Sequence, residues 1–92
     1  MQTQYEIAVI GSGNAAEGIV HGILRRSILL DDRIIATDPN EIRRELFARR
    51  FGIAVTDENR RAVENSYIVL LAVKPQQFKT VVDGFADLIR PD

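Results

Sequence analysis

The sequence has no cysteine and a single histidine among its 92 residues. The first absence excludes disulfides and thiolate metal sites, and one histidine excludes a metal site built from several imidazoles. Long apolar runs are also missing, because the longest, Ile68–Val73, is far shorter than the roughly 20 residues that cross a bilayer. Residues 1–6 are largely polar and lack the basic region of a signal peptide. We therefore expect no metal, no membrane and a cytoplasmic protein.

Neither sign of charge predominates, since the chain has 12 Lys and Arg and 13 Asp and Glu, for a formal net charge of −1. A nucleic-acid-binding domain would gather an excess of basic residues on one face. Here the arginine pairs are interspersed with acidic residues, which is typical of solvated helix faces. The pair Arg43-Arg44 is set apart because it opens a helix near the ligand cleft predicted below. We expect no nucleic-acid partner.

Apolar and polar segments alternate in a way that predicts four strand–helix units within one domain, residues 1–92. Strands are expected at Ile7–Ile10, Arg33–Thr37, Ile53–Val55 and Tyr67–Val73, and helices at 14–26, 41–50, 58–65 and from Pro75 onward. The first and last strands are apolar throughout, so helices should cover both faces of the sheet. Right-handed crossovers then favour an α/β, Rossmann-like parallel sheet with strand order 3-2-1-4.

The most informative segment follows the first strand and opens a helix; this glycine turn consists of Gly11, Ser12, Gly13, Asn14, Ala15 and Ala16. The first glycine allows a tight turn, the second lets a ligand approach bare backbone, and Ala16 permits close packing of helix on strand. A helix N-terminus presents unpaired N–H groups and the positive end of its dipole. The turn therefore predicts a phosphate or pyrophosphate site.

Two further segments converge on the glycine turn in the predicted strand order. The carboxyl ends of the first, second and fourth strands lie side by side there, which is where ligands bind in open parallel sheets. Asp38 follows Ala16 by 22 residues, near the spacing of an acid that holds an adenine ribose, although Asp-Pro sequences also cap helices. Lys74 and Pro75 end the fourth strand at the cleft; the alternative is a solvated lysine beside a helix-starting proline.

Three segments together resemble the pyrroline-5-carboxylate reductase family: Gly11–Glu17, Ala36–Asn40 and Leu71–Gln76. The resemblance runs from Ile7 to about Val82, and its most specific part is Ala-Val-Lys-Pro-Gln at residues 72–76. Ala15 departs from the family's usual methionine, which alters packing only. The family reduces the cyclic imine 1-pyrroline-5-carboxylate to proline with NADPH or NADH. The resemblance thus implies NADP(H) or NAD(H) as cofactor and a small cyclic imine as substrate.

The resemblance also implies roles for single residues. The glycine turn would hold the pyrophosphate, Thr37, Asp38 and Asn59 would lie near the adenosine ribose, and Ala72, Val73, Lys74 and Pro75 would line the cleft toward the nicotinamide. No catalytic residue is assigned. Family members continue into a further strand and a helical domain that dimerises and supplies most of the substrate pocket. We therefore expect the cofactor-binding portion of a homo-oligomeric oxidoreductase, inactive alone, ending at the turn signal Arg90–Asp92 before a fifth strand.

Two other functions fit the same turn: the cofactor domain of a β-hydroxyacid or prephenate dehydrogenase, and a non-catalytic nucleotide-binding regulatory module. The segment Ala72–Pro75 argues against the first of these. Cofactor choice stays open as well, because Asp38 favours NADH whereas Arg43 or Arg44 would suit the 2′-phosphate of NADPH, which the family more often prefers. The apolar edge of strand Tyr67–Val73 predicts self-association of the 92-residue chain.

Overall fold

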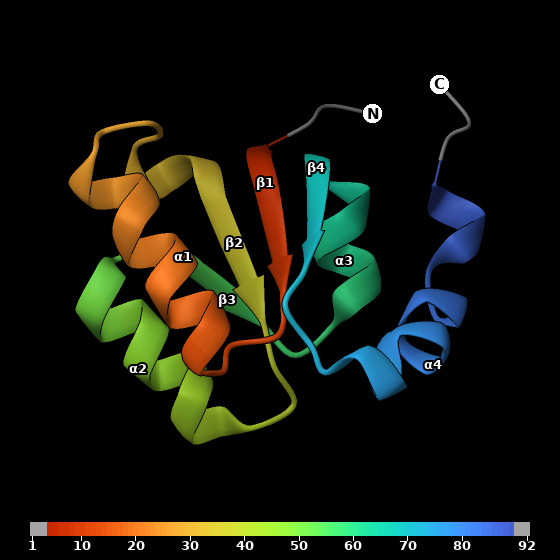
Figure 1. Cartoon of the computed structure of the whole chain (residues 1–92). Coiled ribbons are helices and arrows are strands. Elements are labelled where there is room, and N and C mark those ends of the chain that lie inside the picture. Colours follow the sequence, from red (N-terminus) through yellow and green to blue (C-terminus); the bar gives the residue numbers. More distant parts are fainter. Residues whose placement is uncertain (1–3, 90–92) are drawn as a thin grey trace.

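The computed structural model describes residues 4–89, and it contains one four-stranded parallel sheet in the order β3-β2-β1-β4 (Figure 1). This order confirms the predicted Rossmann-like α/β fold. The strands are β1 (Tyr5–Ile10), β2 (Ile34–Thr37), β3 (Ala54–Thr56) and β4 (Ser66–Leu71). The helices are α1 (Asn14–Arg25), α2 (Glu41–Phe51), α3 (Asn59–Glu64) and α4 (Phe78–Asp83), with 3₁₀ turns at Asp31–Arg33, Pro75–Gln77 and Ala86–Leu88. The turn signal Arg90–Asp92 lies outside the described residues.

Successive residues of β1 pack into two separate cores, because side chains alternate between the two faces of a strand. Val9 packs with Val20 of α1 and Phe47 of α2 on one face of the sheet, and all three are fully buried. Ala8 packs on the opposite face with Val63 of α3 and with Phe85, which follows α4. Figure 1 shows the same division, with α1 and α2 on one side of the sheet and α3 and α4 on the other. Burial of β1 on both faces is what the apolar run predicted.

The two ends of α2 follow local rules that the sequence made visible. The Asn40 side chain accepts a hydrogen bond from the Arg43 N–H at 3.2 Å and so caps the first turn. Gly52 ends the helix with φ +68°, a left-handed conformation that glycine adopts at little cost. The start of α2 lies beside the glycine turn, where Arg43 Nε donates to Ser12 O.

The chain after β4 differs from its prediction in two ways. The expected single helix from Pro75 is broken into a 3₁₀ turn, α4 and a second 3₁₀ turn, because Phe85 leaves the helical path and is almost fully buried in the second core. The strand ends at Leu71 instead of Val73. It occupies a sheet edge, as expected for this chain, but Tyr67 and Ile68 are 71% and 51% exposed there, although the strand was predicted to be covered on both faces. The beginning of β4 is therefore not covered on both faces.

Candidate functional site

The glycine turn is locked between the ends of β2 and β4. Gly11 has φ +104°, and a Cβ there would lie 3.0 Å from both Ala72 O and Val73 Cγ1. The Gly11 N–H donates to Thr37 O at 3.0 Å, while Ile10 O accepts from the Ala72 N–H at 2.8 Å. Gly11 is thus required both for its backbone conformation and for the close approach of the chain after β4. Ala72, predicted to line the cleft, acts here as the backbone against which the turn packs.

Ser12 directs every polar group that it has into the protein. Its N–H donates to Asp38 Oδ2 at 2.9 Å, its Oγ donates to Thr37 O at 2.9 Å, and its carbonyl accepts from Arg43 Nε at 2.6 Å. The side chain is fully buried. Ser12 therefore braces the turn from inside, and the N–H groups of Gly11 and Ser12 already have partners in the protein.

The next N–H groups along the turn belong to the first turn of α1. Gly13 is the N-cap of α1, and the first helical bond runs from the Glu17 N–H to Gly13 O at 3.0 Å. The N–H groups of Asn14, Ala15 and Ala16 precede that bond and so have no partner within the helix. A Cβ built on Gly13 meets no heavy atom within 4 Å. An anion therefore has both donors and open space at this helix end.

Asp38 holds the chain after β2 and caps no helix, since Asn40 is the N-cap of α2. Its Oδ2 accepts from the Ser12 N–H, and its Oδ1 accepts from the Asn40 N–H at 2.8 Å. Each carboxylate oxygen can accept a further hydrogen bond. The two backbone donors thus fix the carboxylate beside the cleft and leave it able to accept hydroxyl groups from a ligand.

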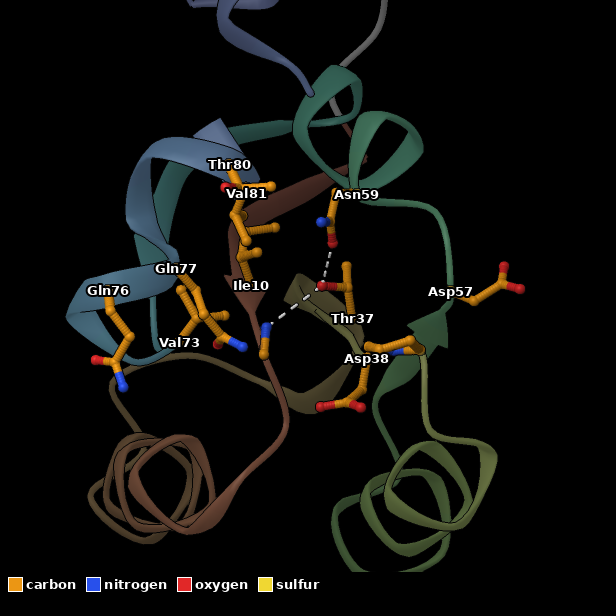
Figure 2. Close-up of a pocket in the computed structure, with 12 residues that line it drawn as sticks. Ile10, Thr37, Asp38, Asp57, Asn59, Val73, Gln76, Gln77, Thr80 and Val81 are labelled. Carbon is orange, nitrogen blue, oxygen red and sulfur yellow. Dashed lines mark hydrogen bonds between the residues drawn. The ribbon is translucent and has the colours of Figure 1, made fainter. Parts of the chain in front are cut away.

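A pocket of about 540 Å³ lies beside Asp38, at the carboxyl ends of β1 and β2 and against α3 and α4 (Figure 2). Five of its lining residues were predicted as site residues: Gly11, Thr37, Asp38, Asn59 and Val73. Within it, Thr37 Oγ1 donates to Asn59 Oδ1 at 2.5 Å, a contact drawn in Figure 2. The structure therefore brings the predicted ribose-side residues to one wall of one pocket.

The opposite wall was missed by sequence reasoning. It carries polar groups from the segment after Val73, as Figure 2 shows for Gln76, Gln77 and Thr80. Gln77, Thr80 and Val81 recur at i, i+3 and i+4, a spacing that puts them on one helix face and that would have revealed them. Asp57 also lines the pocket. Lys74 and Pro75 are exposed, and Pro75 opens a 3₁₀ turn, which agrees with the alternative of a solvated lysine beside a helix-starting proline.

The arginine pair at the start of α2 contacts the glycine turn and the chain after β2, unlike an ordinary solvated pair. Arg44 Nη1 donates to Asp38 O at 2.8 Å. Arg43 Nη2 donates to Glu17 Oε1 at 2.8 Å, and Arg50 pairs with the other oxygen of the same carboxylate. The hydrogen bond from Arg43 and the charges of both arginines hold the pKa of the Glu17 carboxyl below its usual range.

Two kinds of feature are missing from residues 4–89. No group of three or more histidine or acidic side chains is arranged to hold a metal ion there. Over the same residues, no helix is long and apolar enough to span a membrane.

Comparisons with known proteins agree with this fold. Residues 6–91 match the family described as NADP oxidoreductase, coenzyme F420-dependent. The pyrroline-5-carboxylate reductase of Pseudomonas aeruginosa is 37% identical over 86 residues, which are 94% of this chain and 31% of that protein. The enzyme of the same name from Pisum sativum is 35% identical over 92 residues, 100% of this chain and 33% of the relative. The chain thus spans about a third of the length of these relatives.

Solved structures give the same picture. A pyrroline-5-carboxylate reductase from Coxiella burnetii superposes with a TM-score of 0.88 at 31% identity, over 98% of this chain and 33% of that one. The Plasmodium falciparum pyrroline carboxylate reductase, solved with NADP bound, shares the fold with a TM-score of 0.77 at 16% identity, over 96% of this chain and 31% of that one. The chain therefore belongs to this oxidoreductase family and, within it, to the pyrroline-5-carboxylate reductases.

Proposed function

We propose that this chain binds a nicotinamide dinucleotide, with the pyrophosphate at the N-terminus of α1 and the adenosine half in the pocket beside Asp38. One observation carries the proposal. The turn's first two N–H groups, from Gly11 and Ser12, already donate within the protein, whereas those of Asn14, Ala15 and Ala16 have no partner within the helix and follow Gly13, where a Cβ would meet no atom within 4 Å. A rigid turn with free donors and no side chain over it suits a doubly charged ligand such as a pyrophosphate.

The remaining residues fit the rest of such a cofactor. Asp38, held by two backbone N–H groups, would accept the adenosine ribose hydroxyls, next to the Thr37–Asn59 hydrogen bond. Of residues 72–75, Val73 lines the pocket, and on this proposal the segment would face the nicotinamide. When bound, the dinucleotide supplies the hydride. What these residues contribute is orientation, by donors fixed before the ligand arrives.

The whole protein, on this proposal, reduces the cyclic imine 1-pyrroline-5-carboxylate to proline. Support comes from the names of the relatives and from the segment Ala72–Gln76, and the chain would be the cofactor-binding third of a longer, homo-oligomeric enzyme. Formation of proline from the imine, assayed with the full-length protein, tests this part. Failure there, with dinucleotide binding intact, would favour another dehydrogenase or a regulatory module.

Cofactor choice follows from charge, and we expect a preference for NAD(H). The Asp38 carboxylate would repel a 2′-phosphate, which carries close to two negative charges. Arg43 and Arg44 offer little compensation, because their guanidinium groups already contact Ser12 O, Glu17 and Asp38 O. Neither arginine is directed at a ligand in the pocket.

Titration of the 92-residue chain with NADH and NADPH tests the cofactor preference. Asp38→Ser should shift the ratio of the two dissociation constants toward NADPH. Asp57→Ser is the matched control, since Asp57 is another acidic residue of the same pocket but follows β3 instead of β2. An unchanged ratio in Asp38→Ser, or an equal shift in Asp57→Ser, would show that the ribose does not lie against Asp38.

A further inference from the structure

Arg43 supports the glycine turn from the side of α2. Its Nε donates to Ser12 O at 2.6 Å and its Nη2 donates to Glu17 at 2.8 Å. The guanidinium also lies 5.7 Å from the centre of the Phe47 ring, which is fully buried. A planar guanidinium donates in fixed directions, so these contacts hold the side chain in one orientation. The direction of the Ser12 carbonyl is fixed with it.

That carbonyl belongs to the same peptide unit as the Gly13 N–H. In a planar trans peptide the C=O and the following N–H point in opposite directions, and none of the peptide bonds in residues 4–89 is cis. Because Arg43 draws Ser12 O toward α2, the Gly13 N–H points away from α2. We propose that Arg43 is a positioning residue that turns the Gly13 N–H toward the pyrophosphate, where it joins the N–H groups of Asn14 and Ala15.

This proposal rests on the proposed dinucleotide site, and it assigns Arg43 a geometric role. Glu17 pairs with both Arg43 and Arg50, so the three groups together carry a net charge of +1, and the loss of one positive charge has to be controlled for in any test of Arg43. The contact that remains specific to Arg43 is its bond to Ser12 O. Replacing the side chain would free the Ser12–Gly13 peptide to rotate, because the carbonyl would lose its partner.

The test compares Arg43→Gln with Arg49→Gln in the 92-residue chain. Arg49 lies on the same helix and is exposed, so its replacement removes the same charge without touching the turn. We expect Arg43→Gln to weaken binding of NADH and of ADP-ribose about tenfold, and Arg49→Gln to leave both unchanged. Arg43→Lys keeps the charge and one donor, so its affinity should fall between those of the parent chain and Arg43→Gln.

Two further readouts separate positioning from general structural damage. The amide NMR signal of Gly13 should shift on titration with inorganic pyrophosphate in the parent chain and stay unmoved in Arg43→Gln. Binding of adenosine, which has no phosphate, should be equal in the two proteins, whereas a merely structural defect would weaken it as well. The proposal would be overturned if Arg43→Gln bound NADH as tightly as the parent chain, or if Arg49→Gln lost as much affinity as Arg43→Gln. It would also be overturned if Arg43→Lys kept the parent affinity while its Gly13 signal stayed unmoved. A parent chain that binds no dinucleotide would instead overturn the proposed function.

Discussion

Replacing Gly13 by valine should abolish most dinucleotide binding while leaving the fold intact. Gly13 has φ −87° and ψ −164°, an extended conformation that β-branched residues adopt readily, and a Cβ there meets nothing within 4 Å. Loss of glycine at the N-cap should cost about 1 kcal/mol of stability or less. The valine methyl groups, however, would fill the space in front of the Asn14 and Ala15 N–H groups. We expect affinity to fall about tenfold or more, or roughly 1.4 kcal/mol.

Gly11→Ala provides the opposite case within the same turn. Its φ of +104° disfavours any side chain, and the new Cβ would sit 3.0 Å from Ala72 O, a backbone atom that cannot move aside cheaply. Backbone strain alone amounts to about 1–3 kcal/mol at such a position, and the close contact adds to it. Gly11→Ala should therefore lower the unfolding temperature by more than Gly13→Val does.

Calorimetry measures both quantities without a tryptophan, which this chain lacks. Thermal unfolding gives the stability of each variant, and isothermal titration with NADH gives its affinity. A folded Gly13→Val protein that binds NADH as tightly as the parent would refute the reasoning, because the pyrophosphate could not then lie over Gly13.

Four further predictions concern stability and association. Gly18→Ala, at an exposed position inside α1 where a Cβ meets nothing within 4 Å, should raise the free energy of unfolding by about 0.5–1 kcal/mol in urea titrations. Phe47→Ala should lower it by about 3–5 kcal/mol, because Phe47 is fully buried in the first core. The pKa of Glu17 is lowered by its arginine partners, so the stability that its carboxylate contributes to the fold is present above about pH 5 and is lost as the pH falls. The difference in unfolding temperature between the parent and Glu17→Gln should therefore shrink as the pH is lowered from about 5. Light scattering should show concentration-dependent self-association through the exposed edge of β4, and Ile68→Lys should reduce it; a monomeric parent at high micromolar concentration would show that the edge is protected.

The sheet could be predicted because its signals are local. The apolar run Ile7–Ile10 indicated a strand buried on both faces, and Asn40 and Gly52 marked the ends of α2 by rules that involve neighbouring residues only. The break after α4 could not be predicted in the same way. Spacing alone fits a continuous helix there, and the competing force is the burial of Phe85 in a core formed by distant strands.

In the site, too, features set by local spacing could be predicted, and features set by tertiary contacts could not. The glycine turn and Asp38 were visible because their spacing is characteristic, and the pocket includes Gly11, Thr37, Asp38, Asn59 and Val73 as expected. The internal use of every polar group of Ser12 was not visible, since its partners lie 25 to 31 positions away in the chain. Which N–H groups stay available to a ligand is therefore decided by tertiary hydrogen bonds and not by the motif.

The central claim is that a dinucleotide binds at the N-terminus of α1, and the most direct measurement follows the backbone amide signals of the 92-residue chain during titration with NADH. We predict saturable one-to-one binding in which the signals of Gly13, Asn14 and Ala15 shift together, with those of Thr37 and Asn59 following at the same midpoint. Saturable binding that leaves the Gly13–Ala15 amides unmoved, or a folded chain that shows no saturable binding, would contradict the account.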